Sequence, residues 1–239
     1  MKSKKIIITV SVIAAAALLI GGAVYSAKNR IKQPEVNVLN NRENELVFDF
    51  SINDFIESFN ARYLRRNEAE YILPLNFNEN WQKETLAEAI HSPHETVLYN
   101  YSADRKMWPL PTISVYVPTN GDYIQEITLD FDWHSYSENL YELYGEMCFC
   151  TLKIFLPELS DEKITELYSA ANQSGYDNMF SSDDWYSKDS VPAVFYYKGG
   201  VGVYSHFAEG SYQRLCIIPV TENTVNEFRQ KGSEIIEIE

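Results

Sequence analysis

The 239-residue sequence lacks the short motifs that identify the common enzyme classes. It has no Gly-x-Ser-x-Gly for a nucleophilic serine, no P-loop for a nucleotide and no His-Glu-x-x-His for zinc. The run Gly199-Gly200-Val201-Gly202 is rich in glycine, but no lysine and no helical pattern follow it. It therefore predicts a two-residue hairpin turn and not a phosphate loop. The motifs indicate no particular enzyme class.

Cysteine is also scarce, with only Cys148, Cys150 and Cys216. An odd count excludes a fully paired disulfide framework. Two alternatives remain. Either Cys216 forms one disulfide with Cys148 or Cys150, or all three cysteines are buried free thiols. No cysteine lies near the end of the N-terminal apolar run, which excludes lipid attachment there.

Basic residues are few beyond the N-terminus. Six of the 20 lysines and arginines and none of the 34 acidic residues lie in the first 32 positions, so positions 33–239 carry a net charge of −20. Such a surface repels nucleic acid, because phosphate contacts need clusters of lysine and arginine. It predicts no nucleic-acid partner. There are two explanations for the negative charge. It attracts a basic protein partner over a long range, or it serves solubility alone.

Only one long apolar run is present, and it lies at the N-terminus. Ile6 to Tyr25 is 20 residues without a charge, which as a helix spans about 30 Å, the hydrocarbon core of a bilayer. We predict a transmembrane anchor, since the run exceeds the roughly 7–15 apolar residues of a cleaved signal; secretion after cleavage is the alternative. Residues 1–5 then form a cytoplasmic segment and residues 26–45 a linker. This layout is typical of a bacterial single-pass protein whose C-terminal domain lies outside the cell membrane.

The whole chain is 45% hydrophobic, enough to build a core, and the patterns of residues 46–239 predict a folded α+β domain. Apolar residues at helical spacing predict helices over residues 53–66, 82–91, 160–175 and 222–230. The stretch 140–156 fits both a strand and a helix, and we favour a helix because a capped helical pattern follows it. Alternating patterns predict strands over residues 45–50, 96–101, 112–117, 123–133, 193–198, 201–207 and 212–219.

This order of elements predicts antiparallel sheets with the helices packed on one face. Helices followed by three strands occur twice, which suggests two similar halves, residues 46–134 and 135–239. No residue pattern is shared between them.

A candidate metal site lies on the polar side of the strand at 123–133. Asp130, Asp132 and His134 alternate with apolar residues, so they share one face, about 6.6–6.8 Å apart. Carboxylates and histidine suit Ca²⁺ or Zn²⁺, the two metals considered, and His91 and His94 could add ligands. The alternative is a solvated strand face without a ligand.

A candidate binding surface lies on the last three strands, where four tyrosines cluster: Tyr196, Tyr197, Tyr204 and Tyr212. Tyrosine combines a large contact area with a polar tip, so such a face can bind protein or sugar. The alternative is ordinary packing at the core and its rim. Together these patterns favour a membrane-tethered, non-enzymatic interaction module. A metal-dependent or hydrolytic cell-surface enzyme is the second hypothesis.

Overall fold

The computed structural model describes residues 36–42, 44–66, 81–86, 95–102, 111–181, 192–208 and 212–239. The predicted anchor at residues 6–25 and the two histidines His91 and His94 lie outside these ranges. Within them, no helix is long and apolar enough to cross a membrane. The chain divides into two compact units, Met1–Lys32 and Gln33–Glu239, and the fold described below is that of the second.

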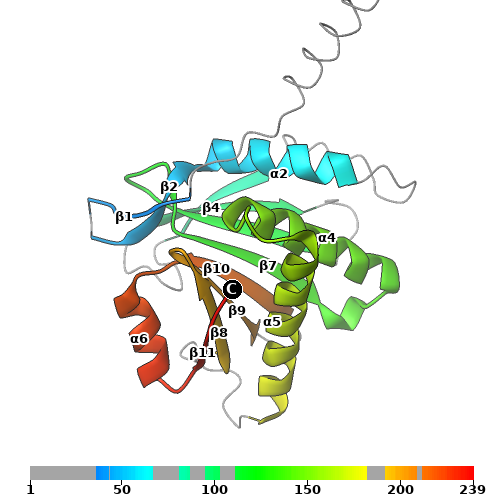
Figure 1. Cartoon of the computed structure of the whole chain (residues 1–239). Coiled ribbons are helices and arrows are strands. Elements are labelled where there is room, and N and C mark those ends of the chain that lie inside the picture. The colour runs from blue at the N-terminus through cyan, green and yellow to red at the C-terminus, as the bar shows by residue number, and fades with distance from the viewer. Residues whose placement is uncertain are drawn as a thin grey trace, which may run out of the picture. The chain divides into compact units, whose positions relative to one another are not determined.

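The α+β class is confirmed, and most of the strands belong to one large sheet (Figure 1). Its eight strands run in the order β11-β8-β9-β10-β7-β5-β4-β3. All neighbours are antiparallel except β11 and β8, which are parallel. The strands are β3 (Trp81–Leu86), β4 (Thr96–Ser102), β5 (Thr112–Pro118), β7 (Glu126–Asp132), β8 (Val194–Lys198), β9 (Val201–Ala208), β10 (Tyr212–Pro219) and β11 (Glu234–Glu237).

A small second sheet joins β1 (Val38–Asn40), β2 (Leu46–Ser51) and β6 (Tyr123–Ile124). The predicted linker at residues 26–45 was therefore too long, because Val38 pairs with Phe48 and the Asn41 side chain accepts a hydrogen bond from the backbone of Glu45. The long strand expected at 123–133 is split between the two sheets, with Gln125 between β6 and β7.

Three helices cover one face of the large sheet, which we call the inner face. They are α2 (Ile52–Arg66), α4 (Glu138–Phe155) and α5 (Asp161–Ser181). Phe55 and Phe59 of α2 join Ile127 and Leu129 of β7 in one core, all fully buried. Each such side chain contributes about 1.5–3 kcal/mol by leaving water, so this core holds the helices against the sheet.

The fourth helix, α6 (Glu222–Gln230), lies on the opposite, outer face (Figure 1). Its Phe228 ring stacks on Phe195 of β8 with centroids 4.2 Å apart, and Tyr204 and Ile218 complete a second core. The prediction of helices on one face only was wrong. The strands at this end of the sheet carry apolar side chains on both faces, and both faces have to be covered.

The ambiguous stretch at 140–156 is helix α4, as favoured, and Ser137 caps its first turn by accepting a hydrogen bond from the backbone of Leu140. Helix α5 does not end at Gly175 but continues to Ser181. A Cβ atom at Gly175 would lie 2.7 Å from the Ser205 hydroxyl. This glycine therefore permits close contact between α5 and β9, and it does not terminate the helix.

The helix predicted over residues 82–91 was wrong where the structure describes it. Residues 81–86 form β3, paired with β4 from Trp81 opposite Tyr101 to Leu86 opposite Thr96. The Lys83 ammonium lies 5.4 Å from the centre of the Tyr99 ring across the ladder. Pairing with a partner strand outweighed a weak local helical pattern.

The two suggested halves are not separate structures. Strand β7 from the first pairs with β10 from the second, with Leu129 opposite Leu215. Helices and strands from both also share one core. The C-terminal strand β11, which the sequence patterns did not predict, completes the sheet beside β8.

Candidate functional site

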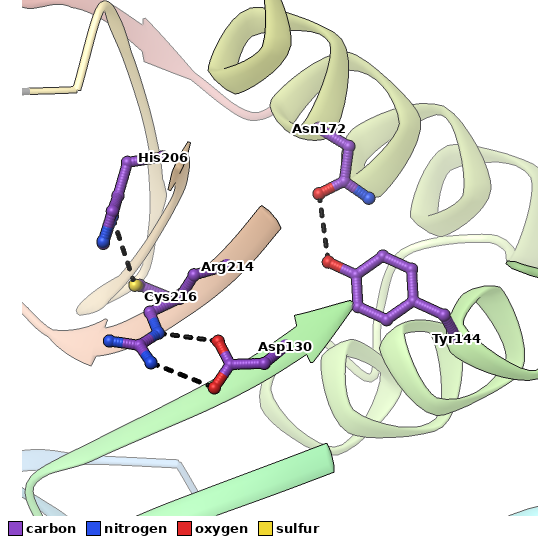
Figure 2. Close-up of polar contacts among 6 residues, drawn as sticks. All are labelled: Asp130, Tyr144, Asn172, His206, Arg214 and Cys216. Atoms are coloured by element: carbon purple, nitrogen blue, oxygen red, sulfur yellow. Dashed lines mark hydrogen bonds and ion pairs between the residues drawn. The ribbon is translucent and has the colours of Figure 1, made fainter. Parts of the chain in front are cut away.

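The carboxylate predicted to bind metal at Asp130 is held by an arginine of the neighbouring strand. Arg214 lies opposite Asp130 in register and donates two hydrogen bonds to it, from Nε at 2.6 Å and from Nη2 at 3.0 Å (Figure 2). Only 18% of the Arg214 side chain and 14% of the Asp130 side chain are exposed. Burial alone would lower the pKa of Arg214, but the charge and hydrogen bonds of Asp130 outweigh it and raise that pKa, so the guanidinium stays charged.

Asp132 and His134 are engaged in a local cap. Asp132 Oδ1 accepts a hydrogen bond of 2.9 Å from the backbone N–H of His134 and so caps the short 3-10 helix η1 (Trp133–Ser135). The His134 ring is 77% exposed, with Nδ1 3.6 Å from the same oxygen. Among the residues that the structure describes, no group of three or more His, Cys, Asp or Glu side chains could hold a metal ion. The Ca²⁺ or Zn²⁺ site thus gains no support here and stays a prediction.

The polar side of β7 is not the solvated face that was the alternative. Glu126 is 2% exposed and Thr128 is fully buried. Tyr116 of β5 lies opposite Glu126, and Arg214 of β10 lies beside Asp130, so side chains from both neighbouring strands exclude water from this face. Burial raises the pKa of the Tyr116 phenol to about 12.

A cysteine and a histidine meet on the same outer face. Cys216 Sγ lies 3.8 Å from His206 Nδ1 (Figure 2). A nucleophilic cysteine needs a thiolate near neutral pH, which a lowered pKa provides. Here burial, with a further contribution from Glu126, raises the pKa of Cys216 well above its ordinary value. The thiol stays protonated, so this contact does not form an activated nucleophile. All three cysteines are buried free thiols, the second of the two alternatives.

The four predicted binding tyrosines do not gather on one surface. Tyr196 and Tyr197 are neighbours in β8 and point to opposite faces, Tyr196 toward the inner core and Tyr197 toward the second core. Tyr204 is 2% exposed, and burial followed by the influence of Cys216 raises its pKa well above the usual value. Tyr212 lies at the start of β10, opposite Asp132. The prediction of a binding role for this set remains untested.

A different group of aromatic rings is exposed at the end of β7. We call Trp133, Tyr136, Tyr141 and Tyr176 the aromatic cluster. The Trp133 and Tyr136 rings are stacked, with centroids 5.5 Å apart and planes within 7°. Tyr141 from α4 lies 5.7 Å from Trp133, and Tyr176 from α5 lies 6.1 Å from it. Tyr136 is 55% exposed and Tyr176 is 40% exposed, so the cluster forms an aromatic surface open to solvent.

Buried hydrogen bonds hold the base of this cluster. The Trp133 indole donates a hydrogen bond of 3.0 Å to the Gln213 side chain, which in turn donates one of 2.6 Å to the backbone carbonyl of Asn172. The Tyr144 hydroxyl donates to the Asn172 side chain at 3.3 Å (Figure 2). Gln213, Asn172 and Tyr144 are all buried. The Trp133 ring, on which Tyr136 and Tyr176 pack, is therefore held in one orientation, which lowers the entropy lost on binding.

The segments that contain the four rings also contain carboxylates, but they contain no lysine or arginine. Glu138, Glu142 and Asp177 are exposed, and the segments 131–146 and 164–181 that supply all four rings contain no lysine or arginine. Sequence reasoning missed this group because α5 contributes Tyr176 from 40 residues beyond Tyr136. The signal that could have found most of it is local: three aromatic residues within 133–141 where a strand ends and a capped helix begins.

Comparison with protein-family models, with curated proteins and with solved structures found no match.

Proposed function

We propose that the chain is a membrane-tethered, extracytoplasmic module that binds a basic protein partner and does so through the aromatic cluster. The tether is the apolar run at residues 6–25, which has the length of a bilayer span. The acidic unit that follows it provides the binding surface.

The observation that carries the proposal is the exposure of Tyr136 and Tyr176 above a hydrogen-bonded base. Large aromatic side chains normally bury their area, and contiguous exposed aromatic surface marks an interaction site. Tryptophan and tyrosine dominate the energetic centres of protein interfaces because they bring a large area with few rotatable bonds.

The charge of the unit determines the kind of partner. A net charge of −20 over positions 33–239 repels acidic proteins and attracts basic ones. Complementary charge raises the rate of association and suppresses wrong partners, while the aromatic contacts supply the affinity. The described residues offer the enzyme hypothesis no comparable support, since Asp130 is paired with Arg214 and the Cys216 thiol is protonated.

Site-specific photo-crosslinking in intact cells tests the proposal. A photoreactive phenylalanine analogue replaces Tyr136 in one strain and Tyr123 in a control strain. Tyr123 is a matched control, because it is 41% exposed but lies on β6, in the other sheet. We expect a discrete crosslinked protein from position 136, absent from position 123, that is rich in lysine and arginine and lost when the wash contains high salt before irradiation.

Two results contradict the proposal. One is the absence of any crosslinked protein from position 136. The other is the same set of products from both positions, which indicates random collisions and not a defined binding surface.

A further inference from the structure

We infer that the aromatic cluster is a site for a guanidinium group, an arginine side chain presented by the partner. This inference rests on the proposed function and adds the chemistry that the site recognises. It follows from the ring geometry, the charge around the rings and the absence of basic residues from the segments that build them.

The ring geometry suits a flat ligand. Trp133 and Tyr136 are parallel within 7°, and Tyr136 is 55% exposed, so its ring offers a planar surface backed by a second ring. Tyr176 lies 6.1 Å from Trp133 and is 40% exposed, so it adds a second open ring. A guanidinium group is planar and stacks on aromatic faces, where the negative face of the ring attracts the positive charge.

The carboxylates that lie close to the rings in the sequence favour a cationic ligand. Glu138 and Glu142 lie one turn apart on α4, and Tyr141 lies three residues after Glu138, so Glu138 neighbours both on the helix surface. Like charges at this spacing repel each other and weaken the helix. A cation bound beside Glu138 and Glu142 would relieve that repulsion. The chain does not supply the cation from these segments, because 131–146 and 164–181 contain no lysine or arginine.

Arginine fits better than the two other ligands that aromatic surfaces bind. A lysine ammonium is compact and strongly hydrated, so it gives up more hydration to lie against a ring and presents no flat face. A sugar stacks on aromatic rings as well, but a neutral sugar gains nothing from the surrounding carboxylates. Trp, Tyr and Arg are also the residues most enriched at the energetic centres of protein interfaces.

The test uses the purified full-length chain and two peptides of equal length and charge, acetyl-(Gly-Arg)₄-amide and acetyl-(Gly-Lys)₄-amide, titrated by calorimetry at low salt. We expect the arginine peptide to bind more tightly than the lysine peptide. Tyr136→Ala and Tyr176→Ala should each lower the affinity for the arginine peptide about 2- to 5-fold, which is the contribution of an exposed cation–π contact. Tyr123→Ala should leave it unchanged.

A second pair of variants tests the charge contribution without removing a ring. Glu142→Gln should lower the affinity for the arginine peptide. Glu158 is an exposed acid beyond the other end of α4, so Glu158→Gln should leave that affinity unchanged. Because all these positions are exposed, the variants should keep the wild-type melting temperature, and each is used only after that check.

Three results overturn the inference. Equal affinity for both peptides, or an affinity unaffected by the ring variants, shows only a general attraction of acidic for basic chains. No binding of the arginine peptide removes the guanidinium site outright. Binding of neutral chitotetraose in its place identifies a sugar platform. In each case the crosslinking from position 136 is an independent readout: a partner captured there leaves the proposed function standing while the arginine chemistry fails.

Discussion

Removing Asp130 should destabilise the protein far more than removing an exposed partner of a salt bridge. Asp130→Ala leaves the Arg214 guanidinium, 18% exposed, without either of its two charge-assisted hydrogen bonds. Breaking a buried ion pair by deleting one partner costs about 3–5 kcal/mol. Because both side chains keep some contact with water, we expect the low end, about 3 kcal/mol. For a unit of this size that lowers the melting temperature by about 6–12 °C.

The matched control is the ion pair between Lys153 and Asp161, with 3.1 Å between Nζ and Oδ1 and Asp161 69% exposed. Asp161→Ala should cost less than about 1 kcal/mol, since exposed pairs contribute little. The double variant Asp130→Ala/Arg214→Met should recover part of the loss, because no unpaired charge is left. Urea unfolding of these three variants, of the single variant Arg214→Met and of the wild type measures these differences.

Two outcomes would refute this reasoning. A loss below 1 kcal/mol for Asp130→Ala would mean that Arg214 finds water or another partner readily. Strict additivity in the double variant would mean that the two side chains do not interact in solution. The same urea experiment tests the metal hypothesis. Since both oxygens of Asp130 accept hydrogen bonds from Arg214, millimolar Ca²⁺ should not raise the urea midpoint of the wild type. A rise that a chelator reverses would contradict this expectation and show that the folded protein binds the metal.

Two further predictions concern the hydrogen bonds below the aromatic cluster and the buried phenol of Tyr116. Gln213→Leu leaves the Trp133 indole and the Asn172 carbonyl without their partner, and it should cost about 1–3 kcal/mol in urea unfolding; a change under 0.5 kcal/mol would show that water replaces the glutamine. Burial raises the Tyr116 pKa from 10.0 to about 12, so the unfolded chain ionises first and stability falls as the pH rises from 10 to 12. At pH 11 this one group accounts for about 1.4 kcal/mol of the loss. Between pH 7 and pH 11, Tyr116→Phe should therefore lose about 1.4 kcal/mol less unfolding free energy than the wild type, as measured by urea unfolding. An equal loss in the two proteins would contradict the assignment.

The features that could be predicted from the sequence depend on contacts between near neighbours. The hairpin at Gly199-Gly200 has positive φ at both residues, 55° and 87°, a backbone conformation that favours glycine. Ser137 caps α4, and Thr221 caps α6 over the residues predicted for that helix. Each of these rules uses residues no more than four positions apart, so the sequence alone contains all the partners.

The features that could not be predicted depend on partners far away in the chain. Strand β3 exists because residues 81–86 find an edge at β4, and α6 lies on the outer face because Phe195 and Ile218 point there. A helical pattern of apolar residues says which side of a helix is buried. It does not say against which face of a sheet that side will pack.

The candidate site shows the same limit most clearly. Alternation located Asp130 on the polar side of β7, but its chemistry is set by Arg214, 84 residues later in the sequence. Arg214 pairs with Asp130, and this pairing gives the Asp130 carboxylate a structural role. Glu138 and Glu142, close in sequence to Tyr136 and Tyr141, lie in a segment where the chain provides no lysine or arginine. The placement of its own cations therefore distinguishes the acids that hold the fold together from those that can recognise a cationic partner.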